Sequence, residues 1–221
     1  MDGPVQIIVR IMAISLTLFK NIFDNKTNKR IDAPDFDAFE SVLYDLSKKP
    51  FASKDKAMLM SPAIYEKDTT RKNDNVIEWA GWCAVDVDDY IPEGDLKDEL
   101  VKRFSAYRFV CYSTASSTSD RPKFRLVFPL NKPVQKEKIR QFWFALQTEL
   151  GDLGDRQTKD LSRMYYIPGS YAGANNFIFS HNDGIDIDVD RLIAKHPAPL
   201  KPNLDNFFDL ISLKPQLKFI F

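Results

Sequence analysis

Two aspartates at the end of an apolar run are the residues of this sequence best suited to chemistry. Asp86 and Asp88 close the run of residues 79–85, which is typical of a strand buried on both faces. Alternate residues of a strand point to the same side, so the two carboxylates face one way and repel each other unless a cation lies between them. Because Mg²⁺ and Mn²⁺ prefer oxygen ligands, the pair predicts a metal site. The alternative is that these acids and Asp89 are solvated residues that end the strand.

Further carboxylates are needed if the site holds two metal ions, which usually requires a third acid from elsewhere in the fold. Asp160 is the first candidate and Asp155 the second, because both precede the apolar residues 164–167. A helix cap or an ion pair is the alternative for Asp160. The alternating acids of residues 186–190 lead directly into the start of a helix, so we expect them to cap it.

Basic residues are segregated along the chain, although 31 Lys and Arg balance 31 Asp and Glu. Residues 102–140 contain ten Lys or Arg and two acids, whereas residues 86–99 contain seven acids and one lysine. Cations and hydroxyls near a metal site are suited to hold phosphates, with a solvated basic surface as the alternative. The candidate nucleotide-binding residues are Ser116, Ser117, Lys123, Arg125 and Arg163.

Other kinds of site find little support. Cys83 and Cys111 lie in apolar runs and are expected to be buried thiols, and neither His181 nor His196 has a partner at metal-ligand spacing. The apolar residues 5–19 are interrupted by Arg10 and are too short to cross a membrane, so we expect no membrane span.

The periodicity of apolar residues predicts an alternation of strands and helices. Strands are expected at residues 14–19, 79–86, 108–114, 124–130, 164–168 and 177–180, and helices at 35–48, 95–104 and 134–150. From residue 79 onward the order is β-α-β-β-α-β, which favours an α+β fold with a mixed or antiparallel sheet of the split type and helices packed on it. We expect one domain over residues 1–196. Residues 197–221, with four prolines, are expected to form a linker and a short helix at 204–213 that leads toward a further domain.

Four segments, in this order and spacing, resemble the archaeo-eukaryotic primase superfamily, and most closely the primase-polymerases of phages and plasmids. They are residues 82–89, 112–118, 122–130 and 160–169. The resemblance implies an RRM-like sheet joined to a smaller α/β unit, with Asp86, Asp88 and Asp160 as metal ligands and catalytic residues. The family's second motif is Ser-x-His, whereas residues 113–117 read Ser-Thr-Ala-Ser-Ser. Either Ser116, Ser117 and Arg125 take over phosphate binding, or the module binds without efficient catalysis.

The resemblance implies a DNA primase or polymerase that works in phage or plasmid replication in a host cytoplasm. Two Mg²⁺ or Mn²⁺ ions would support attack of a 3′-hydroxyl on a (d)NTP along a single-stranded DNA template, with a replicative helicase as a candidate partner. The alternatives are a non-catalytic replication-initiator module that binds DNA and a metal-dependent nuclease. Because a cation from solution would be the partner of Asp86, we expect Asp86→Asn to abolish synthesis without disturbing the fold.

Overall fold

The protein is described by a computed structural model over residues 13–154 and 160–198. Asp155 and the expected helix at 204–213 of the Pro-rich tail lie outside the described residues. The helices are α1 (Phe36–Ser47), α2 (Leu96–Arg103), α3 (Ile139–Glu149) and α4 (Val189–Lys195), with short 3₁₀ turns η1 (Lys54–Lys56), η2 (Asn73–Asn75) and η3 (Lys136–Lys138). The strands are β1 (Ile14–Phe19), β2 (Arg30–Ala33), β3 (Pro50–Phe51), β4 (Leu59–Ser61), β5 (Ala63–Tyr65), β6 (Val76–Trp79), β7 (Trp82–Val87), β8 (Phe109–Ser113), β9 (Phe124–Pro129), β10 (Val134–Gln135), β11 (Tyr165–Tyr166), β12 (Ser170–Tyr171) and β13 (Ile178–His181).

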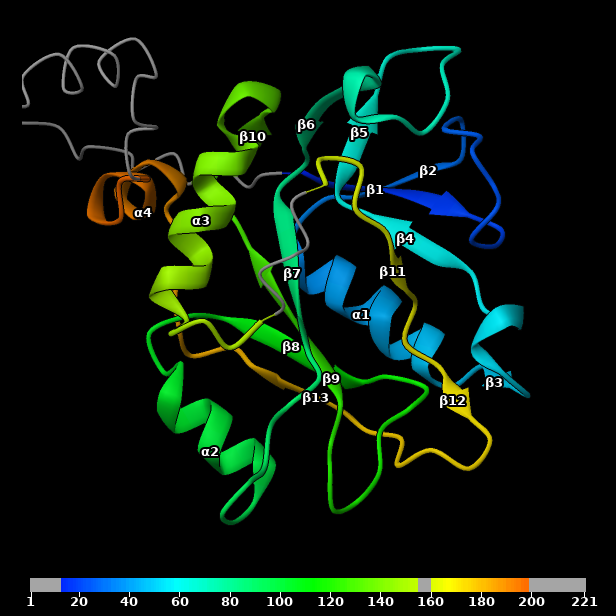
Figure 1. Ribbon diagram of the computed structural model, residues 1–221, viewed down its shortest axis with the longest axis vertical. Coiled ribbons are helices and arrows are strands. Elements are labelled where there is room, and N and C mark those ends of the chain that lie inside the picture. Colours follow the sequence, from blue (N-terminus) through cyan, green and yellow to red (C-terminus); the bar gives the residue numbers. More distant parts are fainter. Residues whose placement is uncertain (1–12, 155–159, 199–221) are drawn as a thin grey trace, which may run out of the picture.

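The central sheet has the strand order β13-β8-β9-β7 (Figure 1). Asp86 lies near the end of β7, which stops at Val87, and Asp88 follows directly. Strand β9 pairs antiparallel with both β7 and β8, so β7 and β8 run in the same direction with β9 between them. Helix α2 connects β7 to β8, which makes this part a split β-α-β unit. The expected α+β class, with antiparallel pairing and packed helices, is confirmed.

Both faces of the central sheet are buried, in agreement with the nearly uncharged sequence of its strands. Cys83, Val85 and Val87 share one core with side chains of α2 and α3. The alternate residues Trp82 and Ala84 belong to a second core with residues of α1 and β1. Asp86 and Asp88 continue the series of alternate residues that begins with Trp82 and Ala84. Their side chains therefore lie on the face of the sheet that packs against α1 and β1.

The second sheet has the order β11-β4-β1-β2 and brings two distant parts of the chain together. Strand β11 pairs with β4 through Tyr165↔Met60 and Tyr166↔Leu59, although these segments lie about a hundred residues apart. Hydrogen bonds tie the sheets to each other, for example from Trp82 Nε1 to the Ser15 carbonyl at 2.8 Å and from the Tyr165 hydroxyl to the Ala84 carbonyl at 2.7 Å. As a result, β11 lies against the aspartate end of β7.

Three expected elements differ from those in the structure. The run from residue 79 is two strands, β6 and β7, because the chain turns at Gly81, whose φ of 83° is strained for any residue with a side chain. The expected helix at 134–150 begins at Ile139, since Val134 and Gln135 pair with β6 as β10. The expected strand at 164–168 is reduced to the two residues of β11 and joins the second sheet rather than the central one.

The capping expected of the acids at residues 186–190, by Asp188, and the expected burial of both cysteines are confirmed. Asp35 caps α1 by accepting from the Ala38 N–H, and Asp188 caps α4 by accepting from the Arg191 N–H. Both cysteine side chains are buried. Within residues 13–154 and 160–198, none of the helices combines the length and apolar character that a bilayer crossing requires.

Gly154 allows the chain after α3 to pass close to β7, and its replacement tests this approach. A Cβ at this position would lie 2.2 Å from Val85 Cγ1 and 2.9 Å from Gln147 Nε2. We expect Gly154→Ala to lower the free energy of unfolding by about 1–3 kcal/mol, the usual cost of overpacking a core, in urea denaturation. Gly94→Ala is the control, because its Cβ would meet only Glu99 Oε1 at 3.6 Å. Equal stability of the two variants would contradict the close approach.

Candidate active site at the end of β7

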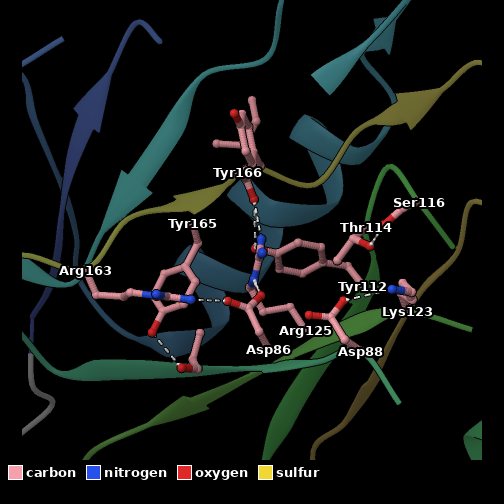
Figure 2. Close-up of polar contacts among 12 residues, drawn as sticks. Asp86, Asp88, Tyr112, Thr114, Ser116, Lys123, Arg125, Arg163, Tyr165 and Tyr166 are labelled. Atoms are coloured by element: carbon pink, nitrogen blue, oxygen red, sulfur yellow. Dashed lines mark hydrogen bonds and ion pairs between the residues drawn. The ribbon is translucent and has the colours of Figure 1, made fainter. Parts of the chain in front are cut away.

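A buried arginine forms the floor of the candidate site. Arg125 in β9 is the cross-strand neighbour of both Asp86 in β7 and Tyr112 in β8. Its Nε donates to Asp86 Oδ1, and its Nη1 donates to the Tyr112 hydroxyl at 3.1 Å and to the Tyr166 carbonyl at 2.7 Å (Figure 2). The guanidinium also lies over the rings of Tyr112 and Tyr165, at 5.5 and 5.1 Å from their centroids. The strand register alone therefore places a cation beside the first aspartate.

A second arginine reaches Asp86 from the other side. Arg163 precedes β11, and its Nη2 donates to Asp86 Oδ2 at 2.9 Å (Figure 2). Burial raises the pKa of the Asp86 carboxyl, but the charges and hydrogen bonds of Arg125 and Arg163 outweigh burial, so the pKa is lowered. Asp86 is thus a carboxylate with both oxygens bound by guanidinium groups.

Asp88 differs from Asp86 in its surroundings. Its side chain is 58% exposed, whereas that of Asp86 is 14% exposed. The nearest cation is Lys123, whose Nζ lies 3.6 Å from Asp88 Oδ1. An exposed ion pair at this distance contributes little to stability, so the oxygens of Asp88 are open to a ligand.

The aspartates border a cleft of about 550 Å³ between the two sheets. Six of the residues expected from the sequence line this cleft: Asp86, Asp88, Ser116, Arg125, Asp160 and Arg163. Lys123 lies beside Asp88 at its edge, and Asp160 precedes a turn rather than a helix. The structure therefore brings most of the expected site residues together.

Ser117 is placed differently from the other expected residues. Its side chain is buried, and its Oγ accepts a hydrogen bond from the Lys123 N–H at 3.2 Å. It holds the loop between β8 and β9 in shape and does not line the cleft. Of the two loop serines, the exposed Ser116 is the one in a position to meet a phosphate.

Two cations that the sequence did not indicate as site residues, Arg71 and Lys54, line the same cleft. Both come from the part of the chain before β6. The Nε atoms of Arg71 and Arg163 are buried and have no hydrogen-bond partner among the described residues. An unsatisfied buried donor costs about 1–3 kcal/mol, and such groups occur where a ligand completes a site. Because Arg71 lies in a loop without a motif, the sequence held no signal for it.

The carboxylates suit a hard divalent cation in chemical type, but of the Asp86–Asp88 pair only Asp88 has oxygens that are open to a ligand. Within the described part of the chain, no three Asp, Glu, His or Cys side chains are grouped as metal ligands. Both oxygens of Asp86 accept from arginines, so an ion at Asp86 would have to replace a guanidinium. Carboxylate oxygens are ligands of the type that Mg²⁺ or Mn²⁺ prefers, and binding at Asp86 Oδ2 would require Arg163 to take another partner.

The same ion pairs correct the expectation that Asp86→Asn leaves the fold intact. That expectation assumed a partner from solution, whereas the partner is Arg125, whose side chain is 8% exposed. Removing the negative charge leaves a buried guanidinium uncompensated, which costs about 3–5 kcal/mol. Asp88 is therefore the better position at which to test chemistry separately from folding.

Comparisons with known proteins identify a solved structure and a family to which the chain is similar. The AEP domain of the primase-polymerase (PrimPol) of cyanophage S-2L is similar in structure, with a TM-score of 0.44 and 12% identity over 84% of this chain and 89% of that chain. No curated protein sequence matches the chain. The family model for the VapE N-terminal domain matches residues 64–199, which is more than half of the 221 residues. The match confirms the resemblance to phage and plasmid primase-polymerases, and the chain belongs to the VapE N-terminal domain family.

Proposed function

We propose that this domain is a DNA primase or polymerase that transfers nucleotides from (d)NTPs to a 3′-hydroxyl on a single-stranded DNA template. One observation carries the proposal: Arg71 and Arg163 line the cleft that holds the Asp86–Asp88 pair, and each has a buried Nε without a hydrogen-bond partner among the described residues. Guanidinium groups bind phosphate oxygens through two parallel hydrogen bonds, so a triphosphate would satisfy both arginines.

Each residue then has a distinct part in the reaction. Arg71, Arg163 and the Ser116 hydroxyl hold the triphosphate, and Lys123 adds positive charge at the edge of the cleft. Arg125 fixes the orientation of Asp86 and does not touch the substrate. The 3′-oxygen attacks the α-phosphate and pyrophosphate leaves, while the arginines stabilise the charge that develops on the phosphate oxygens.

Divalent metal would complete the site. Asp86, Asp88 and Asp160 would hold Mg²⁺ or Mn²⁺, two ions in all, which would lower the pKa of the 3′-hydroxyl and neutralise the triphosphate. The triphosphate offers Arg163 new partners and so frees one oxygen of Asp86. A host cytoplasm and a replicative helicase as partner belong to the same proposal.

A second function is favoured by the arginine-bound state of Asp86 and by the absence of histidine from residues 113–117. In that case the domain is a replication-initiator module that binds DNA without chemistry. Template binding with no incorporation under any metal would support it. Cleavage of a labelled single strand with Mg²⁺ and no nucleotide would instead indicate a nuclease.

Asp88→Asn separates chemistry from folding. We expect incorporation of labelled nucleotide on a single-stranded template, with Mg²⁺ or Mn²⁺ and with or without primer, to fall by about 100-fold or more, because a metal ligand contributes several kcal/mol to the transition state. The melting temperature should not change, since Asp88 has only a distant ion pair. Asp89→Asn is the matched control, because Asp89 is also exposed but does not line the cleft. Undiminished incorporation by Asp88→Asn would refute the metal-site assignment.

Arg71→Gln tests the phosphate site directly. Calorimetry with a non-hydrolysable nucleoside triphosphate analogue should show affinity reduced by about 10- to 100-fold, because a hydrogen bond to a charged group contributes about 1.5–3 kcal/mol. Arg140→Gln, at an exposed position of α3 outside the cleft, should bind as the original protein does. If Arg71→Gln binds the analogue with unchanged affinity, Arg71 is not a phosphate ligand.

A further inference from the structure

The loop between β1 and β2 carries an aromatic side chain that is more exposed than any other large apolar side chain among the described residues. Phe23 is 91% exposed, and the adjacent Ile22 is 49% exposed. Ile22 also lines the cleft that holds Asp86 and Arg163. Phe23 is therefore the immediate neighbour in the chain of a residue that lines the candidate active site.

Hydrogen bonds order the turn that presents Phe23. The Asn21 side chain accepts from the Phe23 N–H at 3.0 Å, and the Asp24 N–H donates to the Asn21 carbonyl at 3.1 Å. The Asp24 carboxylate accepts from the N–H groups of Lys20 at 2.8 Å and Lys26 at 3.0 Å. These hydrogen bonds fix the backbone of the turn in the conformation that exposes the Phe23 ring. Binding of a ligand to the ring would therefore cost little conformational entropy of the loop.

The same turn is joined to the segment that contains Arg71. The Arg71 N–H donates to the Asn25 carbonyl at 2.9 Å, and the Thr27 hydroxyl donates to the Thr69 carbonyl at 2.7 Å. An isolated antiparallel bridge between Lys26 and Thr70 adds to this connection. Phe23 and the phosphate-binding arginine are thus parts of one hydrogen-bonded edge of the cleft.

The charges around Phe23 indicate what the ring would contact. Lys20, Lys26 and Lys29 are exposed on the same loop, while its acid, Asp24, is engaged with backbone N–H groups. Lys54 of η1 lines the same cleft as Ile22. A single aromatic ring among lysines, next to a phosphate site, matches single-stranded nucleic acid, whose bases stack on aromatic rings and whose backbone binds cations. A protein partner would more commonly meet a contiguous apolar patch.

We propose that Phe23 is a base-stacking contact for single-stranded nucleic acid at the rim of the cleft, with the lysines of its loop along the phosphate backbone. The inference rests on the proposed function and adds to it a place where the strand is held. Stacking is independent of base identity because every base has an aromatic face, so this contact holds a strand without selecting its sequence.

Binding of a fluorescein-labelled oligonucleotide to the full chain, followed by anisotropy, tests the proposal. We expect Phe23→Ala to weaken binding by about 5- to 100-fold, as removal of one base-stacking ring does, and Phe23→Trp to restore most of the affinity. Ile91→Ala, another exposed apolar residue at 73%, is the matched control and should bind normally. A 2-aminopurine placed along the strand should show a fluorescence change at one position that is lost in Phe23→Ala.

The outcomes separate this inference from the proposed function. If Phe23→Ala binds the strand as tightly as the original protein while Asp88→Asn still loses incorporation, the stacking role is wrong and the polymerase proposal stands. If Phe23→Ala alters self-association in sedimentation without changing DNA affinity, the ring is a protein contact and the inference is overturned. If the original chain neither binds single strands nor incorporates nucleotide, both proposals fail.

Discussion

The buried guanidinium of Arg125 is the interaction on which the rest of the site depends. A charge removed from water is costly unless it is paired and fully hydrogen-bonded, and here Asp86, Tyr112 and the Tyr166 carbonyl supply the partners. These partners come from β7, β8 and β11, so one side chain joins three strands of two different sheets. The geometry at the end of β7 is therefore fixed by the need to satisfy this cation.

Arg163 balances two kinds of partner. One side of its guanidinium binds Asp86, while its Nε is buried without a partner among the described residues. An incoming phosphate would satisfy the second side and compete for the first. Under the proposed function, nucleotide binding and release of the Asp86 carboxylate are consequently linked, because both depend on the same donor groups.

Much of this site could be predicted from sequence, because its main signals are local. The apolar run that ends at Asp86 and the alternation around Arg125 are each visible within a few consecutive residues, and strand register then brings the two side chains together. The length of the helix at residues 134–150 was overestimated because Val134 and Gln135 pair with β6, a contact that periodicity does not reveal. Arg71 was not predicted for a related reason. Its place in the cleft depends on how the residues before β6 pack against the rest of the domain, and the sequence around Arg71 has no pattern that indicates this packing.

The pairing of β11 with β4 also separates the unit that folds from the stretch that matches the family model. That stretch begins at residue 64, after β1, β2, α1 and β4. A fragment cut there would leave Tyr165 and Tyr166 without the strand to which they bond, and would expose Trp82 and Ala84, which belong to a core shared with the missing residues. Arg163, which precedes β11, would lose its support, although every candidate residue from Arg71 to Arg163 would still be present. The boundaries of sequence similarity are thus narrower than the boundaries of the cooperative structure.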